Sequence, residues 1–111
     1  MKDFLVIFRE LDARATGHSP EFIQEHQKKW RSWMDDLQQQ EKLTGGGGLS
    51  LEGRVVKGSD KQTTEGAYYT GAEFIGGFLF IKATDLEEAA ELVKSCPIFE
   101  ADGFAEIREL I

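Results

Sequence analysis

The order of apolar segments in the sequence predicts an α+β fold of the ferredoxin-like type, βαββαβ, with an antiparallel sheet and two helices on one face. Strand-like segments lie at residues 3–9, 73–83 and 104–110, and two segments with helical periodicity lie between them. That order is typical of the split β-α-β unit. The 111 residues contain no repeat and no linker long enough to divide them, so residues 1–111 are expected to form a single domain.

The two strongest strand segments carry apolar side chains on both faces. In residues 3–9, one face holds Phe4, Val6 and Phe8, and the other holds Leu5 and Ile7. In residues 73–83, one face is expected to hold Phe74, Phe78 and Phe80, and the other Ile75, Leu79 and Ile81. Gly76 and Gly77 interrupt this second segment and predict a bulge. Strands that are apolar on both faces are expected to be covered on both sides.

The first helix is expected to begin after Ser19, which can cap it, and to run to about Lys42. Its apolar face carries Phe22, Ile23, His26, Trp30, Trp33, Met34 and Leu37. The second helix is expected to begin at a capping box formed by Thr84 and Glu87 and to end before Pro97.

The segments between the first helix and the long second strand are rich in glycine and polar residues. Residues 45–48 are four glycines, which we expect to form a flexible turn. They do not indicate a phosphate-binding loop, because they follow a helix end and contain no Gly-Lys-Ser or Gly-Lys-Thr. Residues 49–57 are expected to form one or two short strands, and residues 58–64 a loop.

The composition disfavours several classes of partner. The chain has 20 acidic and 13 basic residues, a net charge of −7, and no isolated basic cluster. We therefore expect no nucleic-acid partner and no membrane partner. One cysteine, Cys96, allows no intrachain disulfide, and with only two histidines we expect neither a metal nor a cofactor. A cytoplasmic location is expected because no signal peptide is recognised and cysteine is scarce.

The two-faced strands also predict an assembly. Two helices can cover only one face of the sheet, and a large exposed apolar patch is rare on a monomer. We expect a homodimer in which the second copy packs its own sheet against the uncovered face. The alternative is that residues 55–69 of the same chain fold back over that face.

Several segments, taken in order, resemble a known family. They are Phe4-Leu5-Val6-Ile7-Phe8-Arg9, Ser19-Pro20-Glu21, Lys42-Leu43-Thr44-Gly45-Gly46, Gly53-Arg54-Val55-Val56, Glu73-Phe74-Ile75-Gly76-Gly77-Phe78, Asp85-Leu86-Glu87-Glu88-Ala89, Cys96-Pro97 and Ala105-Glu106-Ile107-Arg108. With His26 and Trp30 in the first helix, this set is similar to the YCII-related, or DGPF-domain, proteins of the dimeric α+β-barrel superfamily. The family's Asp-Gly-Pro-Phe signature corresponds here to Glu65-Gly66-Ala67-Tyr68, which lacks the proline.

The resemblance implies a dimer packed sheet to sheet, with a cleft between helix, sheet and partner. It also implies that a histidine and a nearby acid are candidates for catalysis. His26 lies in the middle of the apolar helix face, where an imidazole can exchange a proton with a substrate. The alternative is a neutral core histidine satisfied by one hydrogen bond. Asp36, about three turns further along the helix, is the candidate acid, and the alternative for it is a solvated helix flank.

Four further residues are candidates for binding a ligand. Trp30 can wall a pocket or simply fill the core. Glu65 stands at the acid of the family signature, Glu73 precedes the long strand, and Tyr68 offers a ring and a hydroxyl. For these three, the alternative is a hairpin with paired aromatic residues.

The sequence leaves three functions open. The first is a cofactor-independent enzyme that acts on a small organic molecule by His26-assisted proton transfer in a cleft near the dimer interface. The second is a non-catalytic small-molecule-binding or regulatory dimeric module. The third is an interaction protein without a ligand.

Overall fold

The computed structural model describes residues 1–11 and 17–111. Its elements in chain order are β1 Lys2–Leu11, α2 Pro20–Gln39, β2 Leu43–Gly48, β3 Arg54–Lys57, β4 Gln62–Glu65, β5 Tyr69–Thr70, β6 Glu73–Ala83, α3 Leu86–Lys94, the 3-10 helix η1 Pro97–Ala101 and β7 Phe104–Glu109. The sequence also predicts a polar connection at residues 11–18; residues 12–16 of it lie outside the described residues, and Leu11 belongs to β1.

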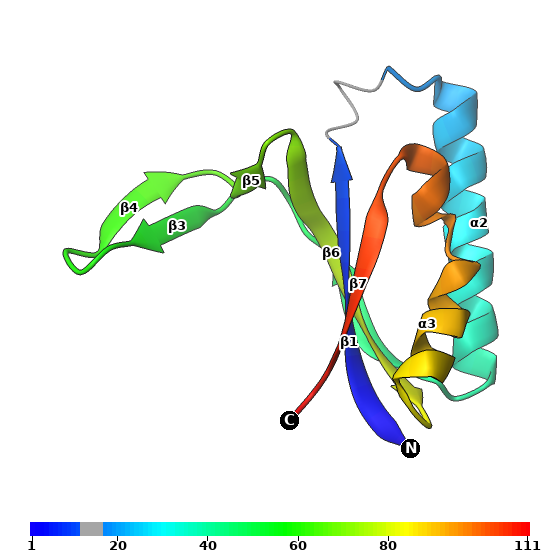
Figure 1. Ribbon diagram of the computed structural model, residues 1–111. Coiled ribbons are helices and arrows are strands. Elements are labelled where there is room, and N and C mark those ends of the chain that lie inside the picture. Colours follow the sequence, from blue (N-terminus) through cyan, green and yellow to red (C-terminus); the bar gives the residue numbers. More distant parts are fainter. Residues whose placement is uncertain (12–16) are drawn as a thin grey trace.

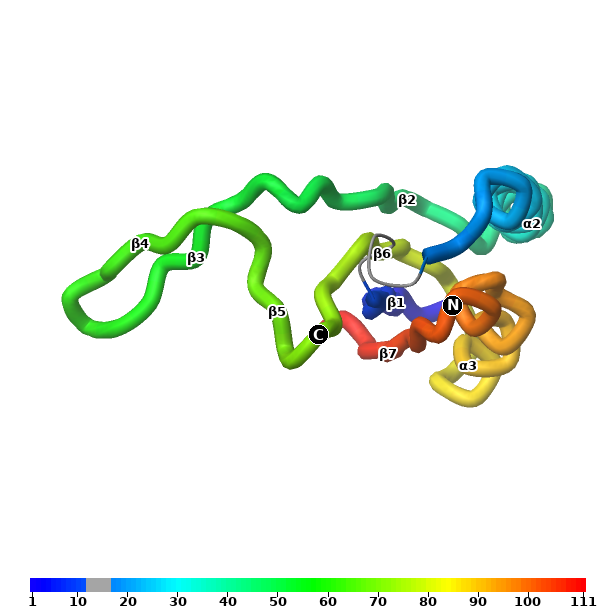
Figure 2. Tube along the Cα trace, turned by 90° about the horizontal axis from the view of Figure 1, so that it is seen from above, coloured from blue at the N-terminus to red at the C-terminus, as the bar shows by residue number. Residues whose placement is uncertain are grey.

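An antiparallel sheet with the strand order β2-β6-β1-β7 forms the body of the protein, and β5 pairs with the start of β6. Helices α2 and α3 both lie on the same side of this sheet (Figure 1). The view from above shows the same two layers (Figure 2). The predicted α+β fold of the ferredoxin-like type, with two helices on one face, is therefore confirmed.

The main core lies between the sheet and the helices. On β1 the helix-facing side chains are Phe4, Val6 and Phe8, and all three are buried. They pack with Leu79 and Ile81 of β6 and with Trp33, Leu37, Ala89, Val93 and Ile98 from the helical layer. The opposite face of the same two strands carries Leu5, Ile7, Phe78 and Phe80, which are only partly buried. We call this surface the outer face.

The bulge predicted at the glycine pair is present, and it changes which side chains share a face. Phe8 pairs with Gly77 and Arg9 with Ile75, so Gly76 is the extra residue. One extra residue reverses the alternation of side chains along the strand. Phe74 therefore pairs with Glu10 on the helix side. The prediction that Phe74 shares a face with Phe78 is wrong.

The glycine run is a strand rather than the predicted turn. Residues 45–48 pair with Gly77–Phe80 of β6, so β2 is an edge strand made largely of glycine. A β-carbon on Gly46 would lie 2.3 Å from the carbonyl oxygen of Phe78, and Gly46 has φ +132°. The absence of a side chain at this position lets the two backbones approach, which is one of the uses of glycine in a strand.

The predicted start of α2 is confirmed, whereas other helix boundaries differ. The Ser19 hydroxyl accepts a hydrogen bond from the backbone of Phe22 at 3.1 Å. The helix ends at Gln39, three residues early, because Glu41 adopts φ 59° and terminates it. The cap of α3 is Asp85 rather than Thr84, since Asp85 accepts from the Glu88 backbone at 2.8 Å.

Strands β3 and β4 form a hairpin, which we call the arm, where residues 58–64 were expected to form a loop. The arm leads away from the sheet in both views (Figures 1 and 2). The alternative in which residues 55–69 cover the outer face is therefore wrong for this chain. The Cα radius of gyration is 15.5 Å, against about 13 Å for a compact domain of this length.

Two neighbouring glycines test the account of β2. Gly46→Ala is expected to lower the free energy of unfolding by at least about 2 kcal/mol, because its β-carbon meets the β6 backbone and its φ is unfavourable. Gly47→Ala is the control, since a β-carbon there has nothing within 4 Å, and a change within about 1 kcal/mol is expected. Urea denaturation measures both. Equal losses would show that the close approach at Gly46 does not matter.

Candidate functional site

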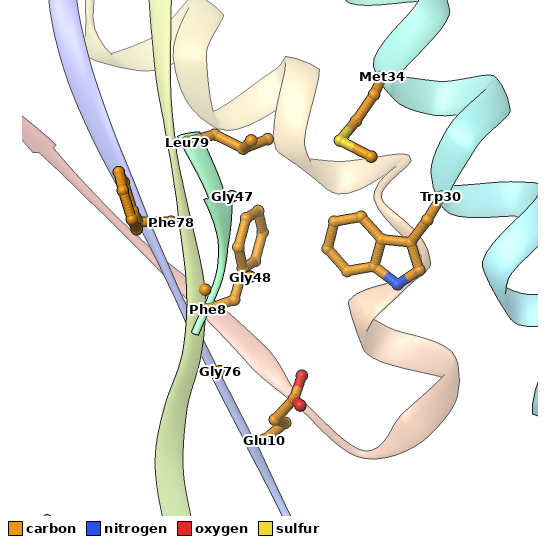
Figure 3. A pocket seen from close by; sticks show the side chains of 10 residues that line it. Phe8, Glu10, Trp30, Met34, Gly47, Gly48, Gly76, Phe78 and Leu79 are labelled. Carbon is orange, nitrogen blue, oxygen red and sulfur yellow. The ribbon is translucent and has the colours of Figure 1, made fainter. Parts of the chain in front are cut away.

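A cavity of about 220 Å³ lies between α2 and the β2 side of the sheet. Its lining comes from three strands and one helix and consists of Phe8, Glu10, Trp30, Met34, Gly47, Gly48, Gly76, Gly77, Phe78 and Leu79. Figure 3 shows the Phe8 ring and the Trp30 indole facing one another, with Met34 on the helix side and the Glu10 carboxylate below. The cavity thus combines apolar walls with one acidic group.

Two features of the sequence create this space. Phe8 and Trp30 meet edge to face with ring centroids 5.0 Å apart, which fixes both aromatic walls. The sheet side of the cavity is formed in part by the glycines of β2 and β6. Because glycine has no side chain, the volume that β-carbons would occupy in an ordinary strand pair stays open.

Glu10 is held over the bulge. A β-carbon on Gly76 would lie 2.5 Å from the Glu10 carboxyl carbon, so the glycine is what allows the carboxylate to rest there. Burial raises the pKa of Glu10 above its ordinary value of 4.5, and the nearby His26 partly opposes that rise. Desolvation of this kind favours the protonated acid.

A chain of polar contacts runs behind the Trp30 wall. The Trp30 Nε1–H donates to His26 Nε2 at 2.9 Å. On the other edge of the imidazole, His26 Nδ1 lies 3.5 Å from Glu100 Oε2. Glu100 in turn accepts a hydrogen bond from Lys29 Nζ at 2.8 Å, and that bond is the main reason that the pKa of Glu100 is lowered. We call these four residues the Trp30 chain.

The donors and acceptors of the Trp30 chain define the state of His26. An indole N–H can only donate, so Nε2 is the unprotonated nitrogen and the ring proton is on Nδ1. Nδ1 is buried and has no hydrogen-bond partner among the described residues, because its distance to Glu100 exceeds that of a good hydrogen bond. His26 is thus a largely buried imidazole that accepts from Trp30 at one nitrogen and has a carboxylate beside the other.

The structure distributes the residues singled out in the sequence over several places. Trp30 lines the cavity, and His26 lies directly behind it. Asp36 is exposed and borders two surface hollows, one along α2 and one between α2 and residues 94–100, so the structure does not bring it to the cavity. The pairing of His26 with Asp36 therefore has no direct support here, and the carboxylates near His26 are those of Glu10 and Glu100.

The other three candidates lie on or near the arm. Glu65 is exposed on β4, 3.8 Å from Arg54 of β3. Tyr68 is also exposed, and Lys57 Nζ lies 5.2 Å from its ring centroid. Glu73 begins β6 opposite Leu11. The lining of the cavity between α2 and the sheet includes none of these three. Tyr68 instead lines a second hollow, of about 360 Å³, between the base of the arm and Arg9 and Ile75 on the sheet.

Sequence reasoning missed Glu10, although a signal was present. Glu10 continues the alternation of Phe4, Val6 and Phe8, so it is an acid at a position that faces the helices. What the sequence could not show is the bulge at Gly76 that leaves room for it.

Three comparisons place the chain among known proteins. The sequence profile of the YCII-related domain matches residues 4–111, so the chain belongs to the YCII-related family. A search of curated proteins found no match. Among solved structures, 5-chloro-2-hydroxyhydroquinone dehydrochlorinase (TftG) from Burkholderia phenoliruptrix AC1100, in complex with 2,5-dihydroxybenzoquinone, is similar, with a TM-score of 0.56 at 15% identity. The match covers 97% of this chain and 93% of that one, and it supports the fold.

Two further observations concern possible partners. Among the described residues, no group of three or more His, Cys, Asp and Glu side chains could hold a metal ion. In the same part of the chain, neither α2 nor α3 has the length and apolar character required to span a membrane.

The raised pKa of Glu10 predicts a pH dependence. Ionising this carboxyl costs the folded state more than the unfolded chain, so the cost is absent below about pH 4.5 and complete above the raised pKa. Glu10→Gln removes the cost, and the variant should gain stability relative to the parent as the pH rises from 4.5 to about 7. Urea denaturation at both pH values measures this gain. Glu65→Gln, on the exposed arm, should show no such trend, and a flat difference for Glu10→Gln would contradict the assignment.

Proposed function

We propose that this protein is a cofactor-independent enzyme that binds a small planar organic molecule in the cavity between α2 and the sheet. In this proposal Glu10 exchanges a proton with the bound molecule, and His26 assists. The observation that carries the proposal is a partly buried carboxyl with a raised pKa inside an otherwise apolar cavity. Such a combination is characteristic of general acid–base catalysts.

The dimensions and walls of the cavity support a ring-shaped ligand. A cavity of about 150 Å³ is enough to hold benzene, so about 220 Å³ accommodates a substituted six-membered ring. Phe8 and Trp30, which contact each other edge to face, offer adjoining aromatic surfaces in the wall of the cavity. The structurally similar dehydrochlorinase binds 2,5-dihydroxybenzoquinone, a molecule of this shape, and this supports the choice of ligand class.

Glu10 takes the role that the sequence suggested for Asp36. An ordinary glutamate is almost fully ionised at neutral pH, whereas a raised pKa keeps a larger fraction protonated and makes the carboxylate a stronger base. The charge state of His26 affects the same carboxyl, because the two groups interact electrostatically. His26 is thereby coupled to proton transfer without lining the cavity.

Hydrogen–deuterium exchange on a named probe tests the proposal. The protein is incubated with 2,5-dihydroxybenzoquinone in D₂O, and proton NMR follows the loss of the ring C–H signal. A ring carbon takes a deuteron from the Glu10 acid and returns a proton to the carboxylate, so no oxidant or reductant is needed. We expect Glu10→Gln to slow the exchange by about 100-fold or more while the probe still binds.

Two variants on β2 control the location. Gly48 pairs with Gly77 on the cavity side, and its β-carbon would meet only the Gly76 carbonyl oxygen, at 3.9 Å. Gly48→Leu should therefore fill the cavity and abolish both binding and exchange. Gly45→Leu adds the same volume on the outer face, where its β-carbon would meet only the Phe80 side chain at 3.7 Å, and it should preserve both. Binding without exchange in the parent would favour the binding module, and no binding at all would refute the proposal.

We further propose that the protein is a homodimer in which a second copy covers the outer face. Ile75 and Phe104 extend this apolar face and are 37% and 42% exposed. Exposed Tyr68 lies with Ile75 in the hollow at the base of the arm, and the arm itself carries exposed Val56. A surface of this extent is typical of an interface rather than of a monomer surface. We retain the cytoplasm as the expected location.

Light scattering tests the assembly. The parent protein should have twice the 12.5 kDa mass of one chain. Ile7→Glu places a charge on the outer face and should give folded 12.5 kDa monomers, because burying an unpaired carboxylate at the interface is costly. Leu86→Glu, at an exposed site on α3, should remain dimeric. A monomeric parent at micromolar concentration would contradict the assembly.

A further inference from the structure

The tryptophan wall of the cavity is attached to a titratable group. Trp30 is only partly buried, and its one polar atom donates to His26 Nε2 at 2.9 Å. Trp33 offers a comparison within the same helix. Its Nε1–H donates to the backbone carbonyl of Leu92 at 3.2 Å, and a carbonyl does not change its protonation. The Trp30 indole thus donates to an acceptor that can be protonated, whereas the Trp33 indole donates to one that cannot.

We propose that His26 is a positioning residue for the cavity, which holds the Trp30 indole in its ligand-binding orientation only while the imidazole is neutral. The inference rests on the proposed function, because it assigns a role to the wall of that same cavity. It differs from a direct catalytic role for His26, since the imidazole acts through Trp30 and does not line the cavity.

The argument follows from donors and acceptors. Neutral His26 has one acceptor nitrogen, and Trp30 uses it. Protonation places a hydrogen on Nε2, so imidazolium and indole would then present two donors to each other, and the hydrogen bond is lost. Imidazole is the side chain that ordinarily makes this change between about pH 5 and 8.

Carboxylates around His26 would be partners for the imidazolium once the bond to Trp30 is broken. Glu100 of η1 faces Nδ1 at 3.5 Å, and Lys29 keeps that carboxylate ionised. Glu10 of β1 interacts with the imidazole from the sheet. Phe22 stacks on the ring, with centroids 5.6 Å apart, and adds no charge. The imidazolium thus has two carboxylates to turn toward, and one of them is the acid in the cavity.

The release of Trp30 would be local. Its ring still packs against Phe8 at 5.0 Å and Trp33 at 5.7 Å, so the indole stays in the core region. What it loses is the polar contact that fixes its rotation about these packing contacts. The cavity wall is therefore expected to become mobile while the fold persists.

Indole NMR signals test the anchor without any ligand. In ¹⁵N-labelled protein each tryptophan gives one Nε1–H signal, and Trp30→Phe identifies the signal of Trp30. As the pH is lowered through the imidazole range, the Trp30 signal should move and broaden, whereas the Trp33 signal should remain in place. A Trp30 signal that does not respond to pH, or one that Trp33 follows equally, would overturn the proposal.

Two substitutions separate positioning from catalysis. His26→Gln keeps an acceptor that does not titrate, so the Trp30 signal should become insensitive to pH. The affinity of this variant for 2,5-dihydroxybenzoquinone should equal that of the parent protein with a neutral imidazole. His26→Leu removes the acceptor and should weaken binding about tenfold at every pH, the value of one hydrogen bond. If His26→Gln binds the probe normally but loses exchange as completely as Glu10→Gln, His26 is a proton carrier and the positioning role is wrong. Because the NMR titration needs no ligand, its result stands even if the exchange reaction is never observed.

Discussion

The antiparallel pairing of β1 with β6, interrupted by one bulge, is the constraint on which the rest of the structure depends. These two strands form the centre of the sheet, and their helix-facing side chains make up most of its half of the core. The extra residue, Gly76, reverses the alternation of β6 and leaves space above the strand. Glu10 occupies that space, so one register shift creates both the edge of the cavity and the place of its acid.

The glycines of β2 and β6 have a shared consequence for the site. Close approach of the backbones at Gly46 keeps β2 attached to the sheet although it carries few side chains. The same lack of a side chain at Gly48, on the cavity side of the strand, leaves the cavity unfilled. The strand gives up packing energy at the edge of the sheet and retains an apolar space large enough for a ring.

Polar groups enter this apolar region as a connected set. Glu10 faces the cavity, His26 lies near it behind Trp30, and Glu100 closes the other edge of the imidazole. A change in the protonation of His26 therefore acts on both the acid and the aromatic wall. The chain belongs to the YCII-related family and shares its fold with a dehydrochlorinase.

The sequence by itself determined the fold class and the strands that are apolar on both faces, because these follow from local periodicity. It also determined the cap at Ser19, the glycine bulge and the family, because these follow from motifs in order. It singled out Trp30, which lines the cavity. It did not show that the glycine run is a strand or that residues 58–64 belong to a hairpin, because a segment without a side-chain pattern takes its structure from its partners. Only the tertiary structure separated Asp36 from the cavity and brought Glu10, His26 and Glu100 together, since that depends on the register of two strands and on the packing of α2 and η1.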